Sequence, residues 1–102
     1  IDFIEGDVTN LDSVKNSITD CDLVIHLAAS LGVVNVEGDP VQTLDINLGG
    51  TKNVLEACRT NNIKKIIFSS SSEVYGEPVK IPIRESDKAI PITTYGISKL
   101  AS

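Results

Sequence analysis

Apolar residues follow two different patterns along this chain, and the patterns alternate. Short continuous apolar runs occur at residues 23–29 and 66–68, and such runs are typical of strands in a parallel sheet that is covered on both faces. Over residues 40–60 the apolar positions recur every three or four residues, which predicts one long helix. Residues 1–5 alternate apolar and polar side chains, which predicts the end of a further strand.

Residues that favour helix starts stand before each predicted helix. They are Thr9 or Asn10 before a short helix through residue 17, Asp39 before Pro40 and the long helix, and Thr93 or Thr94 before a helix that begins near Tyr95. Gly49 and Gly50 lie inside the long helix, where each costs about 1 kcal/mol relative to alanine. We therefore expect a sheet or a ligand to approach the helix closely at these glycines.

The resulting order is strand, helix, strand, helix, strand, loop and helix. This alternation predicts an α/β fold with a parallel sheet and right-handed crossovers. Residues 30–39 and the proline-containing segment 76–92 are predicted loops. The 102 residues suffice for one small domain, and no apolar stretch approaches the roughly 18 residues that a membrane span requires.

Composition narrows the classes of partner. The formal net charge of −5 argues against nucleic acid or an anionic membrane as the main partner, but a nucleotide held by local backbone N–H groups remains compatible with it. Cys21 and Cys58 form no CxxC pair, and His26 is the single histidine, so no metal site is expected. We expect reduced thiols and a cytoplasmic protein. The start lacks Met and resembles no signal peptide, which suggests an internal piece of a longer protein.

Candidate chemistry centres on Tyr95 and Lys99. Four residues apart on a helix, they share one face, and an ammonium near a phenol favours the phenolate, so the tyrosine can exchange a proton near neutral pH. Ser71 follows the strand at 66–68, where open α/β sheets bind ligands. Together these groups suit oxidation of an alcohol by hydride transfer. Taken singly, such a Tyr–Lys pair is more often a solvated helix face, and a serine run is more often a turn.

Five motifs lie in order along the chain: GDV at 6–8, DLVIHLAA at 22–29, NLGGT at 47–51, IIFSSSSEVYG at 66–76 and YGISK at 95–99. As a set they resemble the extended short-chain dehydrogenases, the branch that contains nucleotide-sugar epimerases and dehydratases. The resemblance implies a partial Rossmann fold, a doubly wound parallel sheet in which residues 1–5, 23–28 and 66–68 are strands 3, 4 and 5.

The same resemblance implies that residues 1–102 are a fragment of one NAD-binding domain. The N-terminal glycine-loop unit and the C-terminal substrate domain of that family have no counterpart in the sequence. We therefore expect the isolated chain to bind NAD poorly, to aggregate and to be inactive. The long helix and the helix at Tyr95 resemble those that pair subunits, which implies a homodimer for the parent protein.

Roles follow from the resemblance position by position. It implies catalytic roles for Ser71, Tyr95 and Lys99, with Tyr95 as the acid/base and Lys99 as the residue that binds the nicotinamide ribose. The implied cofactor is NAD, and the implied cofactor-binding residues are Asp7, Val8, Leu27, Ala28, Ala29, Asn47, Ser69, Tyr95 and Lys99. His26, set in an apolar run, is expected to be a structural strand residue.

The residues after Ser71 discriminate between reactions of the family. The 4,6-dehydratases carry an Asp-Glu pair there, whereas this chain has Ser72-Glu73, which counts against dehydration. The first hypothesis is 4-epimerisation of a UDP- or other NDP-hexose, and the second is decarboxylation of a UDP-glucuronate-like sugar. A hypothesis of another class is a non-catalytic NAD(P)-binding scaffold or sensor, since fold does not fix function.

Overall fold

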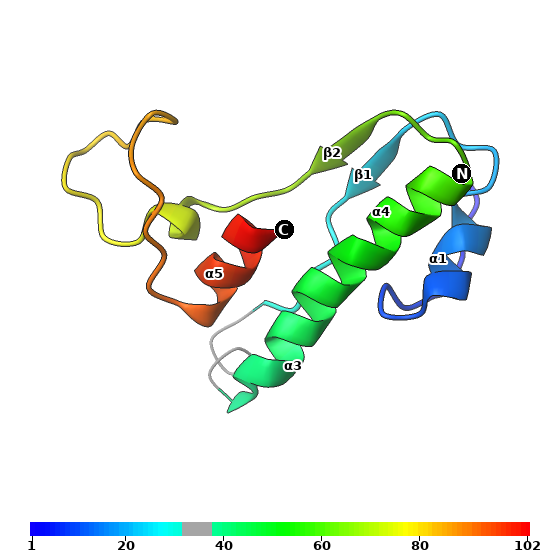
Figure 1. The fold of residues 1–102 in the computed structure, drawn as a ribbon, viewed down its shortest axis with the longest axis horizontal. Coiled ribbons are helices and arrows are strands. Elements are labelled where there is room, and N and C mark those ends of the chain that lie inside the picture. Colours follow the sequence, from blue (N-terminus) through cyan, green and yellow to red (C-terminus); the bar gives the residue numbers. More distant parts are fainter. Residues whose placement is uncertain (32–37) are drawn as a thin grey trace.

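The structure is a computed structural model that describes residues 1–31 and 38–102 (Figure 1). Its elements are α1 (Leu11–Ser17), β1 (Val24–His26), α3 (Pro40–Leu44), the π-helical segment η1 (Asp45–Gly49), α4 (Gly50–Thr60), β2 (Ile66–Phe68), the 3₁₀ turn η2 (Ser72–Tyr75) and α5 (Thr94–Ala101). The predicted loop at 30–39 lies partly outside the described residues, and the loop at 76–92 forms no helix or strand.

β1 and β2 form a parallel two-stranded sheet, the only sheet in the described part of the chain. In its register Val24 pairs with Ile66, Ile25 with Ile67 and His26 with Phe68. The connection between the strands is the long helical run α3–η1–α4, which lies alongside them in Figure 1. The predicted parallel α/β arrangement is therefore confirmed.

Two expectations about the sheet are wrong. Residues 1–5 form no strand, and the side chains of Ile1, Phe3 and Ile4 are exposed. A strand needs a hydrogen-bonded neighbour, and β1 and β2 pair only with each other. The sheet is also not covered on both faces, because Ile25 and Ile67 remain 57% and 53% exposed. No described element packs on the face that these two residues share.

The core lies between α1, α4 and the start of β1. Its buried side chains are Val14, Val54, Ala57, Cys58 and Ile63, with Leu11, Ile18 and Val24 packed around them. Asn10, one of the two predicted cap candidates, starts α1: its Oδ1 accepts from the N–H of Ser13 at 3.0 Å. Asn53 on α4 also donates to the carbonyls of Val8 and Thr9, each at 2.9 Å, so the turn before α1 is held against α4.

The long helix predicted over 40–60 is confirmed, with one irregularity. Asp39 caps it by accepting from the N–H of Gln42 at 2.8 Å, and Pro40 occupies the first turn. Over Asp45–Gly49 the helix widens to π geometry, which often marks functional sites. Asn47 is buried within this segment.

Gly50 is the point where the turn before α1 comes closest to the helix. A methyl group built on Gly50 would lie 2.8 Å from Val8 Cγ2, whereas one built on Gly49 would meet nothing within 4 Å. The close approach expected at the glycine pair is therefore present at Gly50 alone.

This contrast gives a stability prediction for the full-length protein. Gly50→Ala should lower the free energy of unfolding by about 1–2 kcal/mol, because overpacking against Val8 outweighs the gain in helix propensity. The matched control Gly49→Ala should raise it by roughly 0.5–1 kcal/mol. Denaturant unfolding measures both, and equal changes in the two variants would contradict the packing.

Candidate active site

Ser71 lies at the turn that follows β2. Its side-chain oxygen accepts from the N–H of Glu73 at 3.2 Å and so caps η2. η2 packs against α5, and a side chain on Gly96 would collide with the carbonyl oxygen of Glu73, at 2.6 Å from the added carbon. Glycine at position 96 therefore lets the turn with Ser71 reach the first turn of the helix with Tyr95.

Thr93 fixes the start of α5. Its hydroxyl oxygen accepts from the N–H of Gly96 at 2.9 Å and donates to Glu73 Oε2 at 2.7 Å. Of the two cap candidates, Thr93 is thus the one used. The sequence singled out Glu73 only as a marker of reaction type, and its bond to the helix cap was missed.

Lys99 and Tyr95 share one face of α5, as their spacing predicts. The ammonium of Lys99 lies 5.7 Å from the centre of the Tyr95 ring and 4.7 Å from that of Phe68, and it donates to the carbonyl of Ser69 at 2.8 Å. Lys99 is only 5% exposed, and burial lowers its pKa from the usual value. The carbonyl and the two ring faces are the groups that stabilise its charge.

Asn47 connects the end of β1 to α5. Its amide nitrogen donates to Ser98 Oγ at 2.9 Å and to the carbonyl of Ser30 at 3.2 Å, and its oxygen accepts from the N–H of Ser30 at 2.7 Å. Both amide protons are therefore used within the protein. Sequence reasoning selected Asn47 but gave no signal for Ser30 or Ser98, since their bonds join segments distant in sequence.

His26 has a structural setting, as expected. Its Nε2 lies 3.1 Å from Thr51 Oγ1, and the Thr51 hydroxyl donates its one proton to the carbonyl of Asn47 at 2.7 Å. Nε2 must therefore carry a proton and donate to Thr51. Burial, and secondly the charge of Lys99, lower the pKa of His26 below its usual 6.5.

The remaining expected cofactor residues lie in two places. Leu27 and Ala28 are exposed and Ala29 is half-buried, directly after β1. Asp7 and Val8 lie instead in the turn before α1, beside Gly50. The carboxylate of Asp7 accepts from the N–H and the hydroxyl of Thr9, both at 2.8 Å, and these bonds lower its pKa.

Two features are absent from the described residues. Among residues 1–31 and 38–102, no group of three or more His, Cys, Asp or Glu side chains is arranged to hold a metal ion. Within the same ranges, no helix has both the length and the apolar character needed to cross a bilayer.

Comparison with known proteins decides the family. Residues 1–102 match the model of the NAD dependent epimerase/dehydratase family over their whole length. The chain belongs to this family. The epimerase/dehydratase chain is 39% identical to a UDP-glucose 4-epimerase of Halalkalibacterium halodurans, over 99% of its own length and 31% of that protein's. It is 41% identical to a putative UDP-glucose 4-epimerase of Methanocaldococcus jannaschii, over 96% and 33% of the respective lengths.

A solved structure confirms the fold. The UDP-glucose 4-epimerase of Brucella ovis in complex with NAD superimposes with a TM-score of 0.90 at 39% identity, covering 97% of this chain and 31% of that one. The partial Rossmann fold is therefore confirmed. The epimerase/dehydratase chain spans about a third of the length of the curated relatives that it matches.

The low pKa of His26 predicts acid sensitivity of the full-length protein. Below about pH 6.5 the unfolded chain binds a proton at this position that the folded protein does not, so stability that is fully present above this pH is lost as the pH falls through the folded pKa. The melting temperature should fall between about pH 7 and pH 5, and should fall less in His26→Gln. Identical pH dependence in both proteins would show that His26 is not the group responsible.

Proposed function

We propose that the full-length protein is an NAD-dependent 4-epimerase of an NDP-hexose. The observation that carries the proposal is the placement of Tyr95 over Lys99 on α5, with the Ser71 turn packed against the same helix. The relatives support the reaction type, since those compared above are described as UDP-glucose 4-epimerases. Support for the cofactor comes from the Brucella ovis epimerase, whose structure is a complex with NAD.

The residues fit such a cofactor at the end of the sheet. Leu27 is 66% exposed directly after β1, which leaves an apolar edge open for a nicotinamide nucleotide. We assign cofactor contacts to residues 27–29, Asn47, Ser69, Asp7 and Val8. When bound, NAD supplies reversible hydride acceptance at C4 of the sugar.

The chain's own residues then handle the proton. The phenolic oxygen of Tyr95 accepts the proton of the C4 hydroxyl, and the ammonium of Lys99 lies 5.7 Å from the centre of the Tyr95 ring. Ser71 donates a hydrogen bond to the same substrate oxygen and holds it as it becomes a carbonyl. Lys99 hydrogen-bonds the ribose of the cofactor. The keto sugar then rotates so that its other face receives the hydride at C4. Tyr95 returns the proton to the C4 oxygen, which completes the epimerisation.

The decarboxylase alternative receives no support from the geometry. The pair Ser72-Glu73 resembles that of the family's sugar-acid decarboxylases, but the Glu73 carboxylate already accepts from the Thr93 hydroxyl at 2.7 Å. The scaffold alternative requires that Tyr95 has no catalytic role, and substitution of this residue tests that requirement directly.

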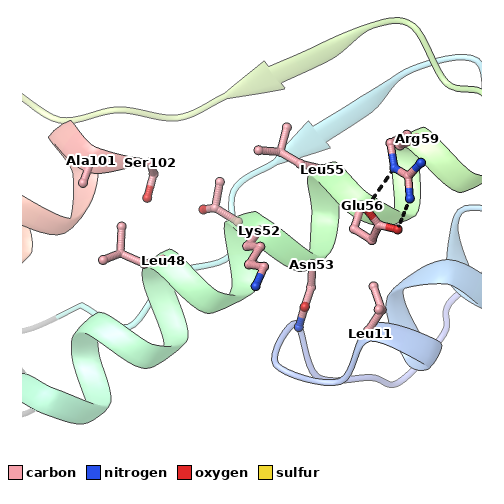
Figure 2. A pocket seen from close by; sticks show the side chains of 10 residues that line it. Leu11, Leu48, Lys52, Asn53, Leu55, Glu56, Arg59, Ala101 and Ser102 are labelled. Carbon is pink, nitrogen blue, oxygen red and sulfur yellow. Dashed lines mark hydrogen bonds and ion pairs between the residues drawn. The ribbon is translucent and has the colours of Figure 1, made fainter.

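The proposed partners are an NDP-hexose substrate and a second copy of the protein. A hollow lies beside the outer face of α4 and is lined by Leu48 and Leu55 of the long helix and by Ala101 at the end of α5 (Figure 2). Leu55 and Leu100 are about half exposed, at 51% and 49%. Exposed leucines on α4 and α5 favour burial in a homodimer, and a cytoplasmic location accords with this assignment.

Replacing Tyr95 by Phe tests the mechanism in the full-length protein. Loss of the phenol should lower kcat for UDP-glucose epimerisation by about 10²–10⁴-fold, because the C4 hydroxyl loses its base. Tyr75→Phe is the matched control and should leave kcat within about twofold, because Tyr75 contributes no group to the proposed mechanism. Undiminished turnover in Tyr95→Phe would overturn the assignment and favour the scaffold reading.

Cofactor retention gives a second test. Because the hydride returns to the sugar, the purified full-length protein should epimerise UDP-glucose with no net formation of NADH. Absorbance at the reduced-nicotinamide band, followed during turnover, measures this. Stoichiometric accumulation of NADH would indicate a dehydrogenase instead.

A further inference from the structure

Ser98 is the most buried polar residue on the helix that carries Tyr95 and Lys99. Its side chain has no exposed surface. Its hydroxyl donates to the carbonyl of Tyr95 at 2.7 Å and accepts from the amide of Asn47 at 2.9 Å. A hydroxyl has one proton, so donation to the Tyr95 carbonyl leaves the oxygen lone pairs to receive the amide.

Asn47 extends this contact to the end of β1. Only 3% exposed, it bonds the backbone of Ser30 through both its oxygen and its nitrogen, at 2.7 and 3.2 Å. A buried chain of hydrogen bonds thus runs from Ser30 through Asn47 and Ser98 to the backbone of Tyr95. Thr51 and His26 extend this chain, because the Thr51 hydroxyl donates to the Asn47 carbonyl and His26 Nε2 lies 3.1 Å from the same hydroxyl.

We propose that Ser98 is a positioning residue, which sets the helix of Tyr95 and Lys99 at a fixed distance from the segment that follows β1. The inference rests on the epimerase function proposed above, because that segment is where the hydride acceptor is placed. Ser98 has no surface through which to touch substrate or cofactor. Ser98 therefore affects the reaction only by setting where Tyr95 and Lys99 lie.

Ser98→Ala in the full-length protein removes the acceptor of the Asn47 amide and leaves that N–H without its partner in a buried site. Small displacements of reacting groups lower rates steeply, so kcat for UDP-glucose should fall about tenfold while KM stays within about twofold.

Ser102→Ala is the matched control. Ser102 lies one turn further along, and its hydroxyl donates to the carbonyl of Ser98 at 2.8 Å without contacting Asn47. This variant removes the same chemical group just beyond the last residue of α5, so its kcat and KM should match those of the unmodified protein.

Asn47→Asp breaks the same contact from the other side with almost no change of shape, because a carboxylate oxygen replaces the donating nitrogen. It also serves if Ser98→Ala fails to fold. Because Asn47→Asp also removes the donation to the Ser30 carbonyl, it should lower kcat at least as much as Ser98→Ala, and the double variant should lose little more than Asn47→Asp alone. Fully additive losses would overturn the proposal.

Amide hydrogen exchange over residues 94–101 separates failure of this inference from failure of the proposed function. Exchange should be faster in Ser98→Ala and Asn47→Asp than in Ser102→Ala, whatever the substrate, because an unanchored helix opens more often. If the unmodified protein does not epimerise UDP-glucose, the function proposal fails. The exchange rates alone then test whether the Asn47–Ser98 bond anchors α5. Unchanged exchange, or an unchanged kcat in an active protein, would show that Ser98 does not position the helix.

Discussion

Two parallel strands can be joined only by a connection that crosses the sheet, and in this chain that connection is the run α3–η1–α4. Its length and its path determine what the rest of the molecule contacts. One part packs against α1 to form the core around Val54 and Cys58, and the η1 part faces α5. The site and the core are therefore attached to the same helical element.

The π segment lies between these two parts. Asn47 sits within it and is turned so that its amide reaches Ser30 and Ser98 together. A wider helical turn displaces the following residues relative to an ordinary helix, which allows a buried side chain to serve two neighbours. Three polar residues, Asn47, Ser98 and Lys99, are buried here with hydrogen-bond partners, which reduces the cost of removing them from water.

Local signals in the sequence predicted local structure well. Asp39 was identifiable as a cap, and Asn10 and Thr93 were each one of two candidates, because a cap depends on residues two or three positions away. The two strands and the long helix were predicted from the spacing of apolar residues along the chain. Residues 1–5 have the pattern of a strand, but pairing depends on a neighbour far along the chain, and none of the described residues supplies it. The exposure of Ile25 and Ile67 was unpredictable for the same reason.

The candidate site divides in the same way. Tyr95 and Lys99 share a face because of their spacing, and five residues of sequence suffice to predict this. The bonds from His26 to Thr51 and from Asn47 to Ser98 join positions 25 and 51 residues apart, so composition and period contain no trace of them. Only the folded arrangement shows that Asn47 bonds to Ser98 on α5 and that Glu73 bonds to Thr93, the cap of this helix.

The partner that Lys99 finds at Ser69 is a main-chain carbonyl. Every amino acid offers that oxygen, so this tie between α5 and the end of β2 is independent of which side chain occupies position 69. Mutational drift at this position leaves the anchor of the lysine intact, while drift at position 99 removes it. The two ends of one bond thus have very different freedom to evolve, although they lie 2.8 Å apart.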